Sequence, residues 1–127
     1  MILVDTSVWI DHFRIGDPVL SSLLMEQQVL GHAFVVGELA LGSIGQRDAV
    51  LGNLRDLPQA LVAGDEEVQL LIERRALFGL GIGYIDAHLL AATLLTIGAR
   101  LWTRDKRLRE VAIRLGVDAT IDHISGG

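Results

Sequence analysis

The chain of 127 residues contains no cysteine and no long uninterrupted hydrophobic run. The absence of cysteine excludes disulfides and thiolate-bound zinc, and it suits a reducing compartment. The longest apolar stretch beyond the N-terminus, residues 89–102, is shorter than the about 20 residues that cross a membrane, and it contains Arg100. The N-terminus lacks a basic segment. We therefore expect a cytoplasmic protein with no membrane attachment.

Several common catalytic motifs are also missing from the sequence. There is no Walker lysine motif and no His-Glu-x-x-His pattern, and residues 41–45 lack the spacing of a nucleophile elbow. Gly79, Gly81 and Gly83 have the wrong spacing for a dinucleotide fingerprint, and no predicted strand precedes them. These residues predict a loop. Nothing in the sequence supports covalent catalysis by a nucleophilic side chain.

The length and the composition predict one domain over residues 1–127, with a flexible tail at about 124–127. Half of the residues are hydrophobic, only 21% are charged, and the mean hydropathy is +0.43. This composition is more apolar than a well-solvated monomer requires. We therefore expect part of the surface to contact a partner.

The net charge of −5 argues against nonspecific binding of nucleic acid by the protein as a whole. Six of the eleven Lys and Arg residues nevertheless fall within residues 100–114. Among them, Arg104, Lys106 and Arg107 flank Asp105 and are candidates for contacting RNA phosphates. A solvated helix face is the alternative interpretation, and it is the usual meaning of such a run.

The hydrophobic pattern predicts strands alternating with helices. Strands are expected at residues 1–4, 29–30, 61–62, 100–103 and 119–121. Helices are expected over about 6–13 after a cap at Thr6 or Ser7, from the Asp17-Pro18 pair onward, and over about 34–41, 46–54, 65–76, 85–97 and 105–115. Such alternation favours an α/β fold whose mainly parallel sheet is flanked by helices. Ligands then bind at the carboxyl ends of the strands.

Four acidic residues stand in strongly apolar surroundings: Asp5, Glu38, Asp86 and Asp105. Asp5 directly follows one predicted strand, and Asp105 lies at the end of another. Carboxylates gathered in a half-buried cleft repel one another and lose hydration, so they either take up protons or hold cations. The four acids would converge if both strand ends and both helix starts faced one edge of the sheet. They are thus the candidate catalytic and metal-binding residues.

Each acid also has an ordinary structural interpretation. Asp5 could be a turn or capping carboxylate, and Glu38 could lie on the polar side of an amphipathic helix. Asp86 could complement a helix dipole, and Asp105 could be an N-cap. No single acid decides between these interpretations. If all four acids converge at one edge of the sheet, a shared functional site explains their positions better than coincidence does.

The chemistry expected of this set is phosphodiester hydrolysis. Ligands that are all oxygen atoms favour Mg²⁺ or Mn²⁺ over zinc and leave positions for water and phosphate oxygens. One or two such ions lower the pKa of a bound water and stabilise the leaving oxygen. Thr6, Ser7 and Thr103 are candidates for orienting the acids or the water. Helix capping and strand propensity are the alternatives for these hydroxyl residues.

Four motifs resemble those of PIN-domain ribonucleases, and more narrowly of VapC-type toxins from bacterial toxin-antitoxin pairs. They are LVDTSVWI (residues 3–10), VGELALG (36–42), GIGYIDAHLLA (81–91) and LWTRDKRL (101–108). The resemblance spans nearly the whole chain. It implies a PIN-like three-layer α/β/α fold. It also matches the four acids to the family's acidic quartet, and Thr6 and Thr103 to its supporting hydroxyl positions.

The same resemblance implies a Mg²⁺- or Mn²⁺-dependent endoribonuclease that cleaves transfer or ribosomal RNA. It further implies a homodimer that assembles with a cognate VapB-type antitoxin, whose tail places a basic side chain among the acids. A catalytically silent PIN fold that only binds an antitoxin is the alternative. A receiver-like signalling domain fits less well, because Asp5 is followed by Thr6 and not by a second acid, and Lys106 lies beyond Asp105.

Overall fold

The computed structural model describes residues 1–121, and the predicted tail at 124–127 lies outside them. Three strands form one sheet in the order β2-β1-β3: β1 (Ile2–Val4), β2 (Val29–Leu30) and β3 (Arg100–Trp102). Both outer strands pair with β1 in parallel, with Leu3 opposite Leu30 on one side and Leu101 on the other. The predicted α/β class with a parallel sheet is therefore confirmed.

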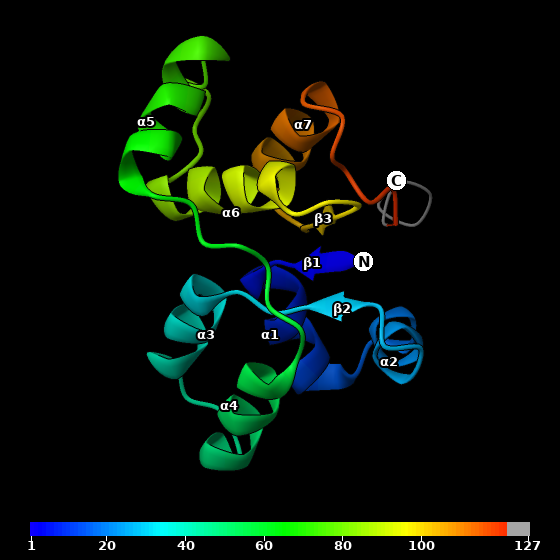
Figure 1. Cartoon of the computed structure of the whole chain (residues 1–127). Helices are drawn as coiled ribbons and strands as arrows, with labels where there is room; N and C mark the ends of the chain where they lie inside the picture. The colour runs from blue at the N-terminus through cyan, green and yellow to red at the C-terminus, as the bar shows by residue number, and fades with distance from the viewer. Residues whose placement is uncertain (122–127) are drawn as a thin grey trace.

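Helices fill the connections between the strands. Within residues 1–121 they are α1 (Thr6–Ile15), α2 (Pro18–Met25), α3 (Ala33–Ala40), α4 (Arg47–Asp56), α5 (Asp65–Arg74), α6 (Tyr84–Leu95) and α7 (Lys106–Arg114). Figure 1 shows α5, α6 and α7 on the β3 side of the sheet, and α2, α3 and α4 on the β2 side. None of the helices in this part of the chain has the length and apolar character needed to cross a membrane.

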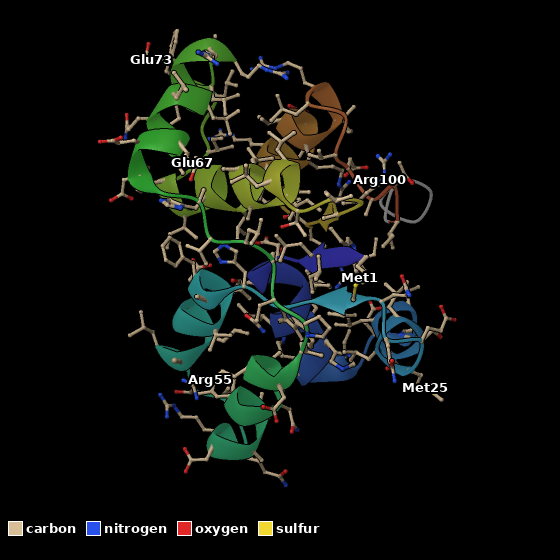
Figure 2. The ribbon with its side chains drawn as sticks, in the orientation of Figure 1. Met1, Met25, Arg55, Glu67, Glu73 and Arg100 are labelled. Carbon is tan, nitrogen blue, oxygen red and sulfur yellow. The ribbon has the colours of Figure 1, made fainter. Side chains whose placement is uncertain are left out.

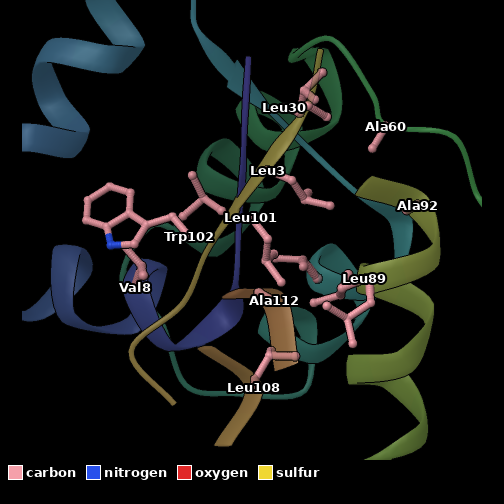
Figure 3. Close-up of a cluster of buried hydrophobic side chains, with 14 of the residues drawn as sticks. Leu3, Val8, Leu30, Ala60, Leu89, Ala92, Leu101, Trp102, Leu108 and Ala112 are labelled. Carbon is pink, nitrogen blue, oxygen red and sulfur yellow. The ribbon is translucent and has the colours of Figure 1, made fainter. Parts of the chain in front are cut away.

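The core is built around β1. Leu3 and Val4 are completely buried, as is Leu101 on β3. Side chains of α6 and α7, including Leu89 and Leu108, pack into the same cluster (Figure 3). Consecutive buried residues explain the uninterrupted apolar run at the N-terminus, since strands covered on both faces do not alternate.

Two helix starts show how local sequence sets the element boundaries. The carboxylate of Asp17 accepts a hydrogen bond from the Leu20 N–H at 2.9 Å, and Pro18 is the first helical residue, as predicted. The predicted cap of α1 is wrong, because Asp5 occupies the N-cap position and makes no side-chain capping bond. Thr6 and Ser7 direct their hydroxyls to carboxylates instead.

Two predicted strands do not form. At residues 61–62 and 119–121 the structure has isolated parallel bridges nearby instead, between Gly31 and Gln59 and between Leu101 and Asp118. The N–H of Leu61 donates to the Thr96 hydroxyl at 3.0 Å, so it takes no part in a ladder. Thr120 has a positive φ of 58°, which interrupts an extended chain. Local β propensity at these segments is overridden by their tertiary surroundings.

The direction of the strands decides where the acids lie. Met1 and Arg100 mark the amino-terminal side of the sheet (Figure 2), where the Arg100 N–H donates to the Met1 carbonyl at 3.1 Å. The carboxyl ends of β1 and β3 therefore meet at the opposite side. There the Asp5 N–H donates to the Trp102 carbonyl at 2.9 Å and extends the pairing by one residue.

We predict that Leu3→Ala lowers the free energy of unfolding by about 2–5 kcal/mol, because it removes a completely buried side chain from the central strand. Urea unfolding of the purified protein measures this change. Leu41→Ala is the matched control, since Leu41 is 91% exposed and its loss leaves no cavity. A loss at Leu3 no larger than the loss at Leu41 would contradict the assignment of β1 as the centre of the core.

Candidate active site

Asp5 is fixed at the carboxyl end of β1 by side chains from two elements. Its Oδ2 atom accepts hydrogen bonds from the Thr103 hydroxyl at 2.8 Å and from the Ser7 hydroxyl at 2.7 Å. Asp5 and Thr103 are both buried, at 6% and 1% exposed. A buried carboxylate is costly unless it is hydrogen-bonded or paired with a cation. The two hydroxyls thus hold the Asp5 carboxylate in one orientation.

Glu38 is tied to the same region through the first turn of α1. Its Oε1 atom accepts a hydrogen bond from the Thr6 hydroxyl at 2.7 Å. Because Thr6 directly follows Asp5, this bond couples the acid on α3 to the end of β1. The bond also accounts for an acidic residue on a helix with few other polar side chains.

Asp86 lies half-buried in the first turn of α6, where its Oδ2 atom accepts a hydrogen bond from the Gly83 N–H at 2.9 Å. Burial raises the pKa of Asp86, the bond from Gly83 lowers it, and the negative charges of Asp5, Asp105 and Glu38 raise it further. The net pKa lies above the ordinary value. Charge repulsion weakens with distance, so Asp5, Asp105 and Glu38 lie near enough to Asp86 for their charges to act on its carboxylate.

Asp105 is the N-cap of α7, and its Oδ1 atom accepts a hydrogen bond from the Leu108 N–H at 3.0 Å. Its own N–H donates to the Thr103 hydroxyl at 3.1 Å. The capping interpretation is thus correct for Asp105, as is the helix-start position for Asp86. A cap engages one carboxylate oxygen, so capping and cation binding are compatible roles for the same side chain.

The donor chemistry of the four acids fits a hard divalent cation. In the described arrangement of residues 1–121, no group of three acids or histidines is drawn together tightly enough to hold a metal ion. Burial nevertheless raises the pKa of Asp86, and repulsion from the other three carboxylates raises it further. A cation among them would offset this repulsion, and oxygen ligands suit Mg²⁺ or Mn²⁺.

The three basic RNA-binding candidates differ in their surroundings. Lys106 and Arg107 are exposed, next to Asp105. Arg107 lies over the backbone of Gly81, where a Cβ atom would come within 2.5 Å of its Nη1 atom. Arg104 instead forms ion pairs inside the protein with Asp11 and Asp17.

Two histidines, His32 and His88, are buried near the helices that carry Glu38 and Asp86. His32 caps α3 through Nδ1, which accepts from the Phe34 N–H at 3.0 Å. Burial and the nearby His88 lower the pKa of His32 to about 4. The ring of His88 lies 4.7 Å from that of Phe34 and 4.8 Å from that of Tyr84. Scattered histidines carry no periodic signal that could have predicted this packing.

We predict that Asp86 titrates above the ordinary aspartate pKa in metal-free protein, and that Asp5→Asn lowers its pKa by removing one repelling charge. Because folding raises this pKa, the stabilising effect of protonated Asp86 is present below the unfolded pKa. It is lost as the pH rises through the folded value. Carboxyl-detected NMR measures the titration.

Asp56→Asn is the control for that titration, since Asp56 is exposed on α4 and does not act on Asp86. An Asp86 pKa at or below the ordinary value would contradict the convergence of the acids. The same conclusion would follow if Asp5→Asn and Asp56→Asn had equal effects.

Comparison with known proteins places this site in a family. The family model described as PIN domain matches residues 2–114. Two relatives named Ribonuclease VapC32, from Mycobacterium tuberculosis strains CDC 1551 / Oshkosh and ATCC 25618 / H37Rv, are each 52% identical over 117 residues. Each alignment covers 92% of this chain and 94% of the relative. The chain therefore belongs to the PIN-domain family, and the predicted resemblance to VapC-type ribonucleases is confirmed.

Proposed function

We propose that the chain is the toxin of a toxin-antitoxin pair and acts as a metal-dependent endoribonuclease. The observation that supports the proposal is the hydrogen-bonded arrangement at the end of β1, where Thr103 and Ser7 hold Asp5 and Thr6 holds Glu38. These acids belong to the motifs that resemble VapC-type toxins. The named relatives are ribonucleases. Each is 52% identical to this chain over 92% of its length.

Asp5, Asp86 and Asp105, together with Glu38, would hold Mg²⁺ or Mn²⁺. When bound, the ion supplies positive charge that lowers the pKa of a water molecule and stabilises the developing charge on the phosphate. The donor set supports this assignment, because it contains only carboxylates and neighbouring hydroxyls. The raised pKa of Asp86 supports it as well, because burial and the charges of the other acids disfavour its ionised form, and a cation would stabilise that form.

The protein side chains then orient the reacting groups. Thr103 and Ser7 fix Asp5, and Thr6 fixes Glu38 through Oε1. We assign to Glu38 the acceptance of a proton from the attacking water, because a held carboxylate is placed to act as a general base. The water oxygen would form a bond to phosphorus as the phosphorus–oxygen bond to the leaving nucleotide breaks. The leaving oxygen would take up a proton from solvent, and Glu38 would release its proton to solvent.

The substrate class that we propose is structured RNA, either transfer or ribosomal RNA. Lys106 and Arg107 are exposed beside Asp105, where their charges suit the phosphates that flank the scissile bond. Their position supports binding close to the acids despite the net charge of −5. The location that we propose for this reaction is the cytoplasm.

The partners that we propose are a VapB-type antitoxin and a second copy of the chain. A cluster of acids with a deficit of positive charge suits an inserted basic side chain, which would take the place of the metal charge. Large apolar side chains remain exposed, among them Ile97 at 101% and Leu61 at 57%. These exposed groups support burial in a homodimer or a toxin-antitoxin complex.

We predict that purified, antitoxin-free protein cleaves total bacterial RNA into discrete fragments with Mg²⁺ or Mn²⁺, and that EDTA abolishes cleavage. Asp5→Asn should reduce the rate at least about 100-fold, since losing a ligand costs more than the 10- to 100-fold typical of groups that only support ligands. Gel electrophoresis of the RNA measures both effects.

Asp48→Asn is the matched control for cleavage. Asp48 lies on α4, its side chain is fully exposed, and it is not one of the four acids of the candidate site. Cleavage that persists in EDTA or in Asp5→Asn would refute the metal-dependent mechanism. A folded, metal-loaded protein that cleaves no RNA would instead favour the silent binding module.

A further inference from the structure

Arg104 joins three segments of the chain beside the acids of the candidate site, Asp5, Glu38, Asp86 and Asp105. It follows β3 and lies between Thr103 and Asp105. Its Nη1 atom contacts Asp11 Oδ2 on α1 at 2.7 Å, and its Nη2 atom pairs with Asp17 Oδ2 at the start of α2. The guanidinium also lies 5.5 Å from the ring centroid of the buried Trp102. We call Arg104, Asp11 and Asp17 the arginine clamp.

The backbone of the same segment reaches the acids. The Arg104 N–H donates to the Ser7 hydroxyl at 3.1 Å, and Ser7 donates to Asp5 at 2.7 Å. Thr103 donates to Asp5 and accepts from the Asp105 N–H. The segment 103–105 is therefore held on one side by the clamp. On the other side it orients Asp5 and carries Asp105.

We propose that Arg104 is a positioning residue, whose clamp fixes the segment 103–105 so that Asp5 and Asp105 are held in register for cation binding and RNA cleavage. This proposal rests on the proposed function. It assigns to Arg104 a role different from direct phosphate contact, for which its place in the basic segment made it a candidate. Asp11 and Asp17 share this positioning role, because they hold the Arg104 guanidinium.

The chemistry of the clamp requires an arginine. A guanidinium is planar and presents a fork of donors, so it can pair with two carboxylates and also lie against an aromatic ring. A lysine offers a single point charge and cannot reproduce this geometry. The side chain of Arg104 is 27% exposed, and those of Asp11 and Asp17 are 36% and 13% exposed. The pairs are thus partly shielded from water, unlike ordinary surface ion pairs.

Asp17 is held from two sides, which makes it a firm anchor. Burial alone would raise its pKa, but the hydrogen bond from the Leu20 N–H and the Arg104 guanidinium together lower it. The carboxylate uses Oδ1 to cap α2 and Oδ2 to bind Arg104. The clamp therefore connects the segment 103–105 to a helix end that is itself fixed.

Substitution of Asp11 or Asp17 distinguishes a positioning role of Arg104 from direct contact between Arg104 and RNA. If Arg104 bound RNA, removing the charge of Asp11 or Asp17 would free the arginine and would strengthen RNA binding. If Arg104 positions the segment 103–105, the same substitutions would reproduce the loss caused by changing Arg104. Small displacements of reacting groups can cost about 100-fold in rate. The loss should therefore fall on kcat and on metal affinity.

The test compares Arg104→Gln, Arg104→Lys, Asp11→Asn, Asp17→Asn and the double variant Arg104→Gln/Asp17→Asn with the wild type. Asn at position 17 keeps a capping oxygen for α2. Arg14→Gln is the matched control, because Arg14 also pairs with Asp11, at 3.8 Å, but its side chain is 72% exposed. Calorimetry measures Mn²⁺ affinity without RNA, single-turnover assays measure cleavage, and fluorescence anisotropy in EDTA measures RNA affinity.

We expect Arg104→Gln and Asp17→Asn each to lower the single-turnover rate about 10- to 100-fold and to weaken Mn²⁺ binding. The double variant should lose little more than either single variant, because all three remove the same interaction. Asp11→Asn and Arg104→Lys should show smaller losses in the same direction. RNA affinity should stay within about two-fold for every clamp variant, and Arg14→Gln should match the wild type in all assays.

Unchanged Mn²⁺ affinity in all folded clamp variants would overturn the proposal, as would weaker RNA binding in Arg104→Gln with a normal cleavage rate. Circular dichroism establishes that each variant is folded, and Asp11→Asn still tests the clamp if Arg104→Gln does not fold. A wild-type protein that binds Mn²⁺ but cleaves no RNA would refute the proposed function alone. The calorimetric comparison would then still decide the role of Arg104.

Discussion

The parallel pairing of β1 with β3 is the constraint on which the site depends. It places Asp5 beside Thr103, with the Asp5 N–H on the Trp102 carbonyl at 2.9 Å and the Thr103 hydroxyl on the Asp5 carboxylate at 2.8 Å. An antiparallel arrangement would put one of these strand ends at the far side of the sheet. Parallel strands need helical connections, and the starts of α1 and α7 therefore follow the same edge. The pairing of β1 with β3 thus brings Asp5 and Asp105, the acids at the two strand ends, to the same edge of the sheet.

The acids of the candidate site lower the stability of the folded protein. Burial disfavours the ionised form of Asp86, and the negative charges of Asp5, Asp105 and Glu38 add to that cost. Hydroxyl groups offset part of the penalty at Asp5 and Glu38. A bound cation, or a basic side chain from a partner, would offset the remainder. The same deficit of positive charge thus explains catalysis and inhibition under the proposed function.

Local signals in the sequence were sufficient to predict the central elements of the fold. A buried apolar run identified β1, and the Asp17-Pro18 pair identified the start of α2. Contacts between distant segments were not predictable in this way. Arg104 lies 93 and 87 residues from its clamp partners, and no periodicity links them. The expected strands at 61–62 and 119–121 failed for the same reason, because strand pairing is decided by tertiary neighbours.

The most direct test of the central claim is anomalous diffraction from crystals of the antitoxin-free protein grown with Mn²⁺. The account predicts an anomalous peak at the carboxyl ends of β1 and β3, with oxygens of Asp5 and of at least two other acids of the quartet at about 2.1 Å from the ion. A well-ordered structure with no peak there would contradict the account. So would a peak only elsewhere, for example beside Asp65 and His88.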